Sequence, residues 1–188
     1  MENRSYILNC ALELFASHGY DAVGVQEVAE KARVTKPTLY HYFGSKKGLL
    51  EAALNENFVH MEEKIRKAAQ YNGDLPLTLH RLVAAYFSFA SNHPLFYRME
   101  MSMIYSPPES DSFKVVAPKL QIQLSILEEL FSSAVRDHGN MRGRHKAYAI
   151  SFLGVINAYI QMSFSGAIEL NDEITFKAVH QYMHGIYS

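Results

Sequence analysis

Apolar side chains recur three and four residues apart along almost the whole chain, and no window shows a sustained alternation of apolar and polar positions. The first spacing gathers side chains on one face of an α-helix, whereas alternation would indicate a β-strand. The chain is therefore predicted to be all-α. Turn-forming clusters of Gly, Pro, Asn and Ser separate the periodic stretches. Helices are expected over residues 5–18, 25–32, 35–43, 45–71, 76–91, 94–105, 115–137, 144–165 and 172–186.

The expected helices change in character near Ser45. Three short helices precede this residue, and the helices after it are longer and rich in Phe, Tyr and Met. A chain of 188 residues is long enough for a small domain joined to a larger one. We therefore expect an N-terminal three-helix domain over residues 1–45 and a larger helical bundle over residues 46–188.

The stretch TKPTLYHYF, residues 35–43, concentrates hydrogen-bonding groups on one short helix. Thr35 is a favourable N-cap, and Pro37 falls in the first turn, where its missing N–H costs no hydrogen bond. With the helix before it, this stretch forms a helix-turn-helix by spacing, and the second helix of that motif enters the major groove of DNA. Leu39 and Phe43, four residues apart, would hold the helix against its own domain.

Residues 7–50, ILNCALELFASHGYDAVGVQEVAEKARVTKPTLYHYFGSKKGLL, resemble the DNA-binding domain of the TetR family of bacterial transcriptional regulators. Three linked motifs carry the resemblance: ALELFxxxGY, VxEVAxxAxV and TKxTLYHYFxSKxxL. They span the first helix, the second helix, and the recognition helix with its exit. The rest of the chain is similar only in style, because it has the helical character of the domain that binds ligand and dimerises in this family.

The resemblance implies a DNA contact for most polar positions of this segment. Contacts to base edges are implied for Lys36, Pro37, Thr38 and His41. Contacts to backbone phosphates are implied for Thr35, Tyr40, Tyr42 and Lys46. We add Lys47 as a second positive charge beside the same phosphates. Tyr40 has an alternative role in the core, because one of the two tyrosines is expected to face inward at least partly.

Two positions depart from the family pattern. Family members usually have Ser or Thr where Gly24 stands, so the side-chain cap of the second helix and its phosphate contact are expected to be missing. They usually have Gly in the turn where Arg33 stands. A positive φ at this position would cost Arg roughly 1 kcal/mol. Arg33 could compensate through a phosphate contact of its own.

Any DNA-binding surface must be local, because the net charge of the whole chain is −1. Residues 7–50 carry five Lys and Arg against four Asp and Glu, which leaves a local charge of +1. One copy of such a domain is expected to bind DNA weakly. Dimerisation would double the number of basic contacts.

The segment 149–168 is uncharged and has the length of a bilayer span, about twenty residues. Small and polar residues recur along it at spacings of three and four, and form a stripe on one helical face. These residues are Ser151, Gly154, Asn157, Gln161 and Ser165. A helix that faces lipid would not usually carry such a stripe, so we interpret the segment as a buried helix–helix contact and expect no membrane association.

The same segment is predicted to form a dimer interface. Gly154 and Ala158 are a small-xxx-small pair that allows two helix axes to approach closely. The family resemblance implies that the last two long helices pair with their twofold mates into a four-helix bundle. In the last helix, Ile174, Ala178, Tyr182 and Ile186 follow one another at four-residue intervals. The predicted interface residues are Gly154, Ala158, Gln161, Ala178 and Tyr182.

Aromatic and Met residues cluster between positions 86 and 105. As a group they favour an effector that is largely apolar, aromatic or elongated over a highly charged one. Polar anchors for it could come from His80, Arg81, His93, Arg98 and Asn157, with no basis for ranking them. The predicted pocket residues are Tyr86, Phe89, His93, Tyr97, Met101, Tyr105 and Asn157.

From these features we expect a homodimeric, ligand-responsive transcriptional regulator. It would bind a palindromic operator in double-stranded DNA, act most simply as a repressor, and be released by a small-molecule effector. The rival interpretation is a helical small-molecule carrier or sensor whose helix-turn-helix has lost specific DNA binding. Gly24 and Arg33 are the two features that keep this rival open.

Other classes of protein receive little support from the sequence. No nucleophile elbow, Gly-rich phosphate loop or paired-carboxylate pattern is found, so we expect neither an enzyme nor a cofactor. His180 and His184 are four residues apart, but no further ligand has suitable spacing, and no metal site is expected. The single cysteine, Cys10, is interpreted as a packing residue. Because one cysteine excludes an internal disulfide and no signal peptide is recognised, we expect a cytoplasmic protein.

Overall fold

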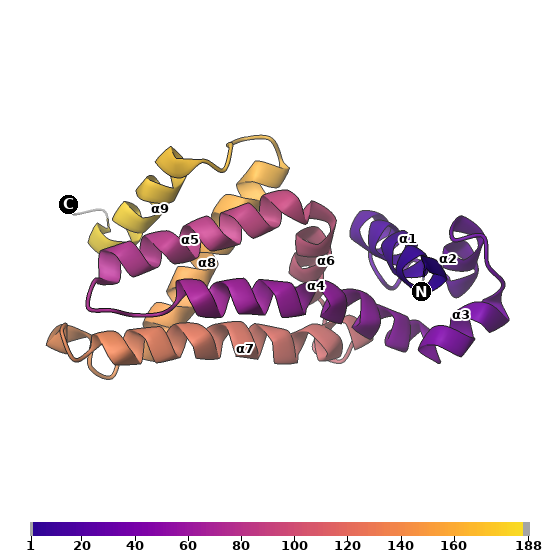
Figure 1. Cartoon of the computed structure of the whole chain (residues 1–188), viewed down its shortest axis with the longest axis horizontal. Coiled ribbons are helices and arrows are strands. Elements are labelled where there is room, and N and C mark those ends of the chain that lie inside the picture. The colour runs from indigo at the N-terminus through magenta and orange to yellow at the C-terminus, as the bar shows by residue number, and fades with distance from the viewer. Residues whose placement is uncertain (1, 186–188) are drawn as a thin grey trace. The chain divides into compact units, whose positions relative to one another are not determined.

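The computed structural model describes residues 2–185, and every regular element in this range is helical (Figure 1). The all-α prediction is therefore confirmed. The α-helices are α1 (Glu2–His18), α2 (Val25–Lys31), α3 (Lys36–Phe43), α4 (Lys46–Ala68), α5 (Leu75–Asn92), α6 (Pro94–Ile104), α7 (Asp111–Ala134), α8 (His145–Phe164) and α9 (Asp172–His184). A short 3₁₀ helix, η1 (Gly139–Met141), lies between α7 and α8.

Two helix ends differ from expectation for identifiable reasons. α7 begins at Asp111, four residues earlier than expected, because the Oγ of Ser110 accepts a hydrogen bond from the N–H of Phe113 at 3.1 Å and caps the helix. α9 ends at His184, and Gly185 follows with a positive φ of 67°. Ile186, expected as the last residue of this helix, lies outside the described residues.

The chain forms two compact units. The first comprises the chain up to His60 together with Leu95–Leu120, and the second comprises Met61–Pro94 and the chain from Gln121 onward. Both α4 and α7 therefore have residues in each unit. The functional division expected between residues 1–45 and 46–188 stays a prediction.

The first unit has a core that holds the helix-turn-helix together. α1 packs against α2, and α2 packs against α3. Ile7, Phe15 and Val28 contribute almost completely buried side chains from the first two helices, and Leu39 contributes one from α3. Cys10 is also buried, in agreement with its interpretation as a packing residue.

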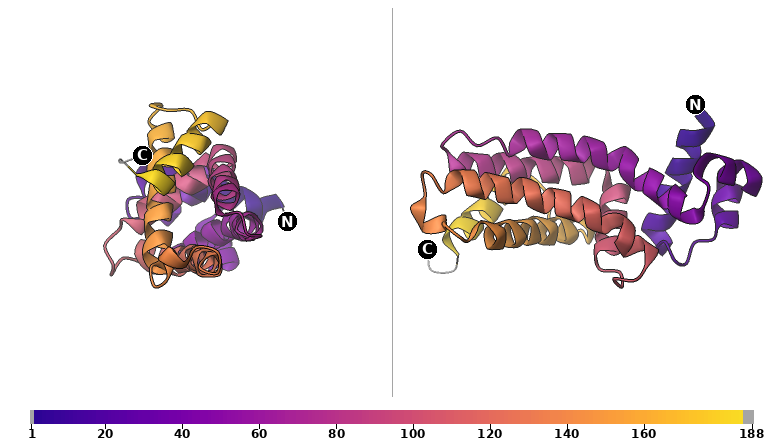
Figure 2. Two further views of the ribbon diagram at one scale, coloured as in Figure 1. Left: turned by 90° about the vertical axis from the view of Figure 1, so that its left-hand side faces the viewer. Right: turned by 90° about the horizontal axis from the view of Figure 1, so that it is seen from below.

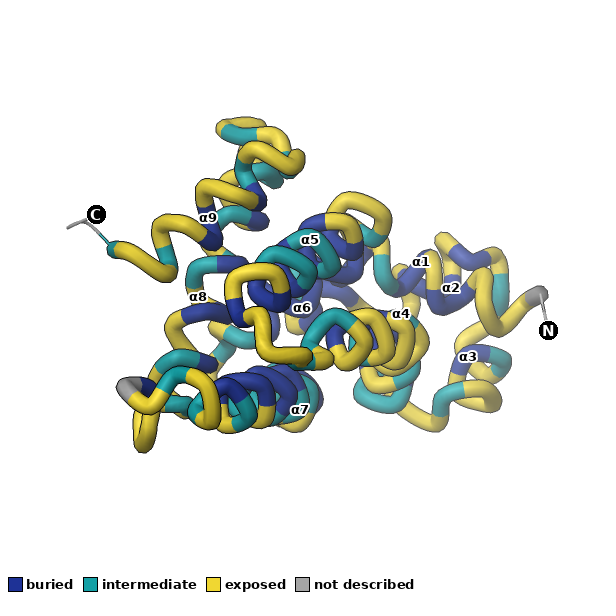
Figure 3. The backbone as a smooth tube through the Cα atoms, turned by 60° about the vertical axis from the view of Figure 1, so that its left-hand side comes forward, coloured by how far each residue is buried: buried dark blue, intermediate teal, exposed yellow. Residues whose placement is uncertain are grey.

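In the second unit α5 packs against both α8 and α9, which also pack against each other (Figure 2). The buried side of α8 carries Phe152 and Ile156, both without exposed surface. The other sides of α8 and α9 are largely exposed (Figure 3). Among the described helices, α8 alone is long and apolar enough to cross a membrane, with 20 residues and a mean hydropathy of 1.3.

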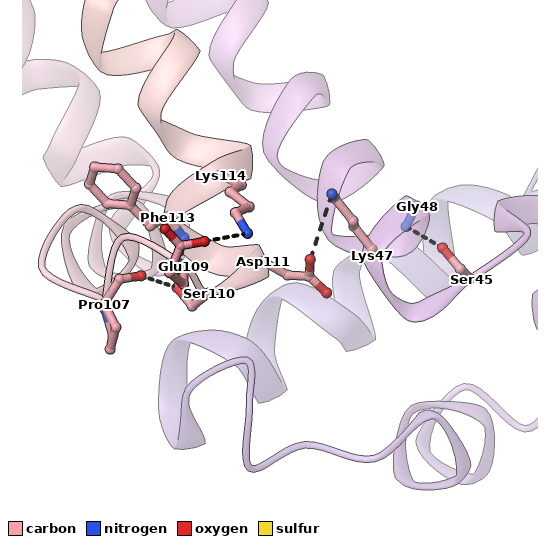
Figure 4. Close-up of polar contacts among 9 residues, drawn as sticks. All are labelled: Ser45, Lys47, Gly48, Pro107, Glu109, Ser110, Asp111, Phe113 and Lys114. Atoms are coloured by element: carbon pink, nitrogen blue, oxygen red, sulfur yellow. Dashed lines mark hydrogen bonds and ion pairs between the residues drawn. The ribbon is translucent and has the colours of Figure 1, made fainter.

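The backbone at the end of α3 comes very close to the first turn of α4. Gly44 takes a φ of 70°, and its N–H donates to the carbonyl of Tyr40 at 2.8 Å. The Oγ of Ser45 then accepts a hydrogen bond from the N–H of Gly48 at 2.9 Å and caps α4 (Figure 4). A β-carbon on Gly48 would collide with the carbonyl oxygen of Phe43. Gly48 is therefore required by the close approach of two backbone segments.

We expect Gly48→Ala to destabilise the protein by about 1–3 kcal/mol, because the added methyl group forces the end of α3 away from α4. Urea unfolding followed by circular dichroism measures this change. Gly139→Ala in η1 is the matched control, since a β-carbon there meets nothing within 4 Å and the φ of Gly139 is not positive. The control should be stabilised by up to about 1 kcal/mol, because alanine narrows the conformations of the unfolded chain. Equal midpoints for the two variants would contradict the close approach at Gly48.

Candidate nucleic-acid interface

The turn between α2 and α3 is closed by backbone hydrogen bonds. The N–H of Ala32 donates to the carbonyl of Val28, and the N–H of Val34 donates to the carbonyl of Ala29, each at 2.9 Å. Arg33, between them, has a φ of 54°. Arg33 thus occupies the left-handed conformation considered from the sequence, at a cost of roughly 1 kcal/mol relative to a position with negative φ.

Thr35 starts the recognition helix as expected. Its Oγ1 accepts a hydrogen bond from the N–H of Thr38 at 3.3 Å, and the two threonine hydroxyls lie 2.8 Å apart. Pro37 lies in the first turn. By contrast, Gly24 caps α2 without any side-chain hydrogen bond. α3 therefore has a side-chain cap, whereas α2 lacks the cap that Ser or Thr would supply.

One side of α3 faces the core and the other side is exposed. Leu39 has no exposed surface. The exposed positions follow one another at helical spacing: Lys36, Pro37, Tyr40 and His41. Thr38 is half-buried, and Thr35 at the helix start is exposed. This is the arrangement that a recognition helix needs, because its polar groups lie where a base pair could meet them.

Both tyrosines of α3 contribute to the exposed surface. Tyr40 is 44% exposed and Tyr42 is 42% exposed. The alternative that places Tyr40 in the core is therefore wrong. The ring of Tyr42 lies between those of its neighbours, with centroids 5.7 Å from His41 and 6.0 Å from Phe43. Phe43 itself is half-buried, so Leu39 is the main anchor of the helix.

Lys46 is held by the turn between α1 and α2. Its Nζ lies 4.2 Å from the centroid of the Tyr20 ring and 3.4 Å from the carbonyl oxygen of Asp21. Burial lowers the pKa of Lys46, and the nearby Asp21 and Asp111 act in the opposite direction. Burial and the same carboxylates raise the pKa of Tyr20 to about 12, so this phenol stays neutral at physiological pH.

Lys47 forms an ion pair that the sequence analysis did not anticipate. Its Nζ lies 3.6 Å from the carboxylate of Asp111, the first residue of α7 (Figure 4). Close by, Lys114 in the first turn of α7 pairs with Glu109, which precedes the helix, at 3.1 Å. A surface pair of this kind contributes only about 0–1 kcal/mol to stability. The pair nevertheless occupies one of the two lysines expected to meet DNA phosphates.

Two basic residues lie at the start of the recognition helix, Arg33 in the turn before it and Lys36 as its first residue. Within residues 2–185, neither Arg33 nor Lys36 has an ion-pair partner. Lys31, in contrast, forms an ion pair with Glu13 at 2.8 Å, so its positive charge already has a partner within the chain. Arg33 and Lys36 are therefore the cations most available for an incoming phosphate or base.

The predicted pocket residues differ in their environments. Three of them are almost completely buried: Tyr86, Phe89 and Tyr97. Met101 is also buried, whereas His93 and Asn157 are half-buried. His93 stacks on Phe89 with ring centroids 4.4 Å apart. Tyr105 is 78% exposed, so its side chain does not lie in a closed cavity. Their role in binding an effector stays a prediction.

The predicted dimer residues divide into two groups. Gly154, Ala158 and Gln161 are exposed along α8. Ala178 and Tyr182 instead serve the interior of the unit, because Ala178 has no exposed surface and the hydroxyl of Tyr182 donates to the carbonyl of Tyr148 at 2.9 Å. The four-residue spacing in α9 therefore marks the side that packs within the chain. Large exposed side chains of α9 are Phe176, 61% exposed, and Met183, 39% exposed.

His180 and His184 lie beside each other on α9, with ring centroids 4.5 Å apart. In the part of the chain that the structure describes, no group of three or more His, Cys, Asp or Glu residues is placed to hold a metal ion. Two imidazoles are fewer ligands than the three or four that protein zinc sites use. The absence of a metal site stays a prediction.

The sequence of the N-terminal unit matches a known family. Residues 7–53 match the family described as "Bacterial regulatory proteins, tetR family". The transcriptional activator FasR of Mycolicibacterium smegmatis is 29% identical over 159 residues, which cover 82% of this chain and 68% of FasR. The transcriptional repressor KstR of the same species is 42% identical over 72 residues, 38% of this chain and 35% of KstR.

Solved structures share the fold. FadR from Bacillus subtilis, solved in complex with stearoyl-CoA, has a TM-score of 0.81 at 17% identity and covers 97% of this chain and 99% of that one. AibR, solved in complex with isovaleryl coenzyme A and operator DNA, has a TM-score of 0.73 at 23% identity, with 95% and 96% covered. These likenesses extend over both units of the chain.

An exposed recognition helix, a capped helix-turn-helix and a helical bundle after it define a DNA-binding transcriptional regulator. Residues 7–53 are the part of the chain that matches the tetR family of bacterial regulatory proteins, and the similarity to the transcriptional activator FasR extends over most of the chain.

Asp111→Asn should strengthen DNA binding by releasing Lys47 for a phosphate. We expect the slope of log K against log salt concentration to steepen by about 0.9, the value for one additional phosphate contact. Fluorescence anisotropy with a duplex over a range of salt concentrations measures the slope. Glu109→Gln is the control, because it removes an equal charge close by and breaks the Lys114 pair instead. A matching change in both variants would show that overall charge, and not Lys47, is responsible.

Proposed function

We propose that this chain is a homodimeric transcriptional repressor that binds a palindromic operator and is released by a small-molecule effector. The observation that carries the proposal is the exposed side of α3, which presents Lys36, Pro37, Tyr40 and His41 while Leu39 is buried. Because these side chains are exposed, they do not contribute to the core of the domain. Their hydrogen-bonding groups are suited to contacts with base edges and phosphates.

In this proposal the side chains of α3 have separate roles. Lys36 and His41 read base edges, together with Pro37 and Thr38, because they lie nearest the start of the helix or on its outermost side. The phosphate contacts fall to Thr35, Tyr40, Tyr42, Lys46, Lys47 and Arg33. Arg33 would thereby gain a contact that offsets the strain of its positive φ.

The dimer is proposed to form through α8 and α9. Apolar side chains are exposed on both helices, with Ile150 53%, Met162 49% and Phe176 61% exposed. Large exposed apolar side chains on two helices that pack side by side support a protein interface there. Gly154 and Ala158 lie among these side chains and present no bulk that would keep two helices apart. In a twofold contact each of these residues meets its own copy or its neighbours.

The effector is proposed to be largely apolar, and an acyl thioester of coenzyme A is the chemical class we favour. The buried aromatic and Met side chains of α5 and α6 support an apolar ligand. FadR and AibR, which share the fold, were solved with acyl-CoA molecules. An effector that binds the DNA-incompetent state more tightly lowers operator affinity, and the operator lowers effector affinity by the same factor.

Repression by occupancy of a promoter is the proposed outcome, in the bacterial cytoplasm and without catalysis. The two relatives described above act in opposite directions, one as an activator and one as a repressor. A repressor requires only that the protein bind DNA and be released from it. Repression is therefore a simpler mechanism than activation.

The rival is a helical carrier or sensor without specific DNA binding, and a selection experiment separates it from a repressor. A pool of random-sequence duplexes is incubated with the full chain, and bound duplexes are sequenced over several rounds. A repressor enriches a palindromic sequence. A carrier enriches none above the non-specific background.

On the enriched sequence, Lys36→Ala and His41→Ala should each cost about 1–3 kcal/mol and relax the base preference. Lys46→Ala should weaken binding to all sequences almost equally and reduce the salt slope by about 1. Circular dichroism checks that Lys46→Ala leaves the fold intact, because Lys46 also contacts Tyr20. An altered preference in Lys46→Ala, with none in the other two variants, would overturn the proposed docking.

Ala158→Arg should separate the dimer into monomers, because the twofold contact would bury two like charges. Operator affinity should fall with it, since one helix-turn-helix has few basic contacts. Sedimentation velocity measures the association state. Gln121→Arg, at an exposed position of α7, is the control and should remain dimeric. A dimer of unchanged affinity in Ala158→Arg would place the interface elsewhere.

A further inference from the structure

The second unit contains a cavity of about 600 Å³ at one end of its helices. Its walls come from the start of α5, the end of α7, η1, α8 and the end of α9. None of the effector-pocket residues named above lines it. Cavities of about 300–1,000 Å³ are typical of small-molecule sites. This cavity is therefore large enough for a ligand and separate from the proposed effector pocket.

Aromatic rings form the most rigid part of the wall. Phe131 lies at the centre, with ring centroids 5.7 Å from Tyr148 and 6.2 Å from Tyr182. Phe152 supports them from behind, 4.8 Å from Tyr182. The hydroxyl of Tyr182 donates to the Tyr148 carbonyl at 2.9 Å and fixes the ring. Burial raises the pKa of Tyr182 to about 12, so the wall carries no phenolate at neutral pH.

The polar side chains of the wall are few: His138, Tyr148, Ser151, Gln181 and Tyr182. No Lys, Arg, Asp or Glu lines the cavity. Ser151 uses its hydroxyl proton in a bond to the Ala147 carbonyl at 2.9 Å. His138 also lines the cavity, and its Nε2 is buried without a hydrogen-bond partner among the described residues. A buried polar atom normally has a partner, so the unpartnered nitrogen points to a ligand atom.

We propose that this cavity binds a neutral, largely apolar molecule with a flat ring system and one oxygen that pairs with Nε2 of His138. The absence of charged lining residues disfavours an anionic or cationic ligand, because its charge would be desolvated without compensation. The rigid aromatic wall favours a flat ring system over a flexible chain. A single carbonyl or hydroxyl oxygen satisfies the one unpartnered nitrogen.

The probe is 6-propionyl-2-(dimethylamino)naphthalene, a neutral naphthyl ketone whose emission shifts to the blue in apolar surroundings. Titrated into the full chain, it should bind saturably with one molecule per chain at this cavity. Val155→Trp places an indole in the cavity and should weaken this binding at least tenfold. Leu77→Trp, at a position 52% exposed on α5 and absent from the wall, is the matched control and should bind as the parent does.

The role of His138 is tested with a second probe, 2-(dimethylamino)naphthalene, which has the same rings without the ketone. His138→Phe should weaken binding of the ketone about tenfold, as the loss of one hydrogen bond predicts, and leave the second probe nearly unchanged. Because this comparison uses one variant with two probes, it stays informative if Val155→Trp fails to fold.

Three results would overturn the proposal. They are the absence of saturable binding to the parent chain, unchanged binding in a folded Val155→Trp variant, and equal effects of His138→Phe on the two probes. In the second of these cases, displacement of the ketone from Val155→Trp by palmitoyl-CoA would assign its binding to the effector pocket. The selection of duplex sequences does not depend on this cavity, so its outcome separates this proposal from the proposed function.

Discussion

The direction of the recognition helix depends on a backbone contact that only glycine allows. The carbonyl oxygen of Phe43, at the end of α3, lies where a β-carbon of Gly48 would be. Gly44 and Ser45 alone connect the two helices, so the chain passes from one helix to the next within two residues. α4 therefore sets the direction of α3 through rigid backbone, while buried Leu39 sets its rotation. The exposed positions of α3 face outward as a result of these two constraints.

The helix-turn-helix could be predicted closely because its signals are local. Thr35, Pro37 and Gly44 mark the start and end of α3 through capping and backbone conformation, which act over one turn of helix. The positive φ at Arg33 follows from the short turn itself. Tyr40 was ambiguous, because a tyrosine can serve either a core or a surface, and only its place relative to Leu39 decides between them.

Features that join distant parts of the chain could not be predicted in this way. The pairing of Lys47 with Asp111 depends on where a loop far along the sequence arrives, and the early start of α7 depends on the capping geometry of Ser110. The spacing of Ala178 and Tyr182 correctly indicated an apolar side of α9, but not whether that side packs within one chain or against another. α8 and α9 each have apolar side chains on more than one side. The spacing of apolar residues does not tell which of these sides packs within the chain.

The exposed apolar side chains of α8 and α9 have a genetic consequence if they join two copies of the chain. In the proposed regulator, base reading would belong to α3, whereas pairing would belong to Ile150, Ala158 and their neighbours. A chain with a damaged α3 would still pair with an intact one. In a cell that makes both versions, most intact chains would be held in mixed pairs with a single working recognition helix. Loss-of-function alleles in α3 would then be dominant, whereas alleles that prevent pairing would be recessive.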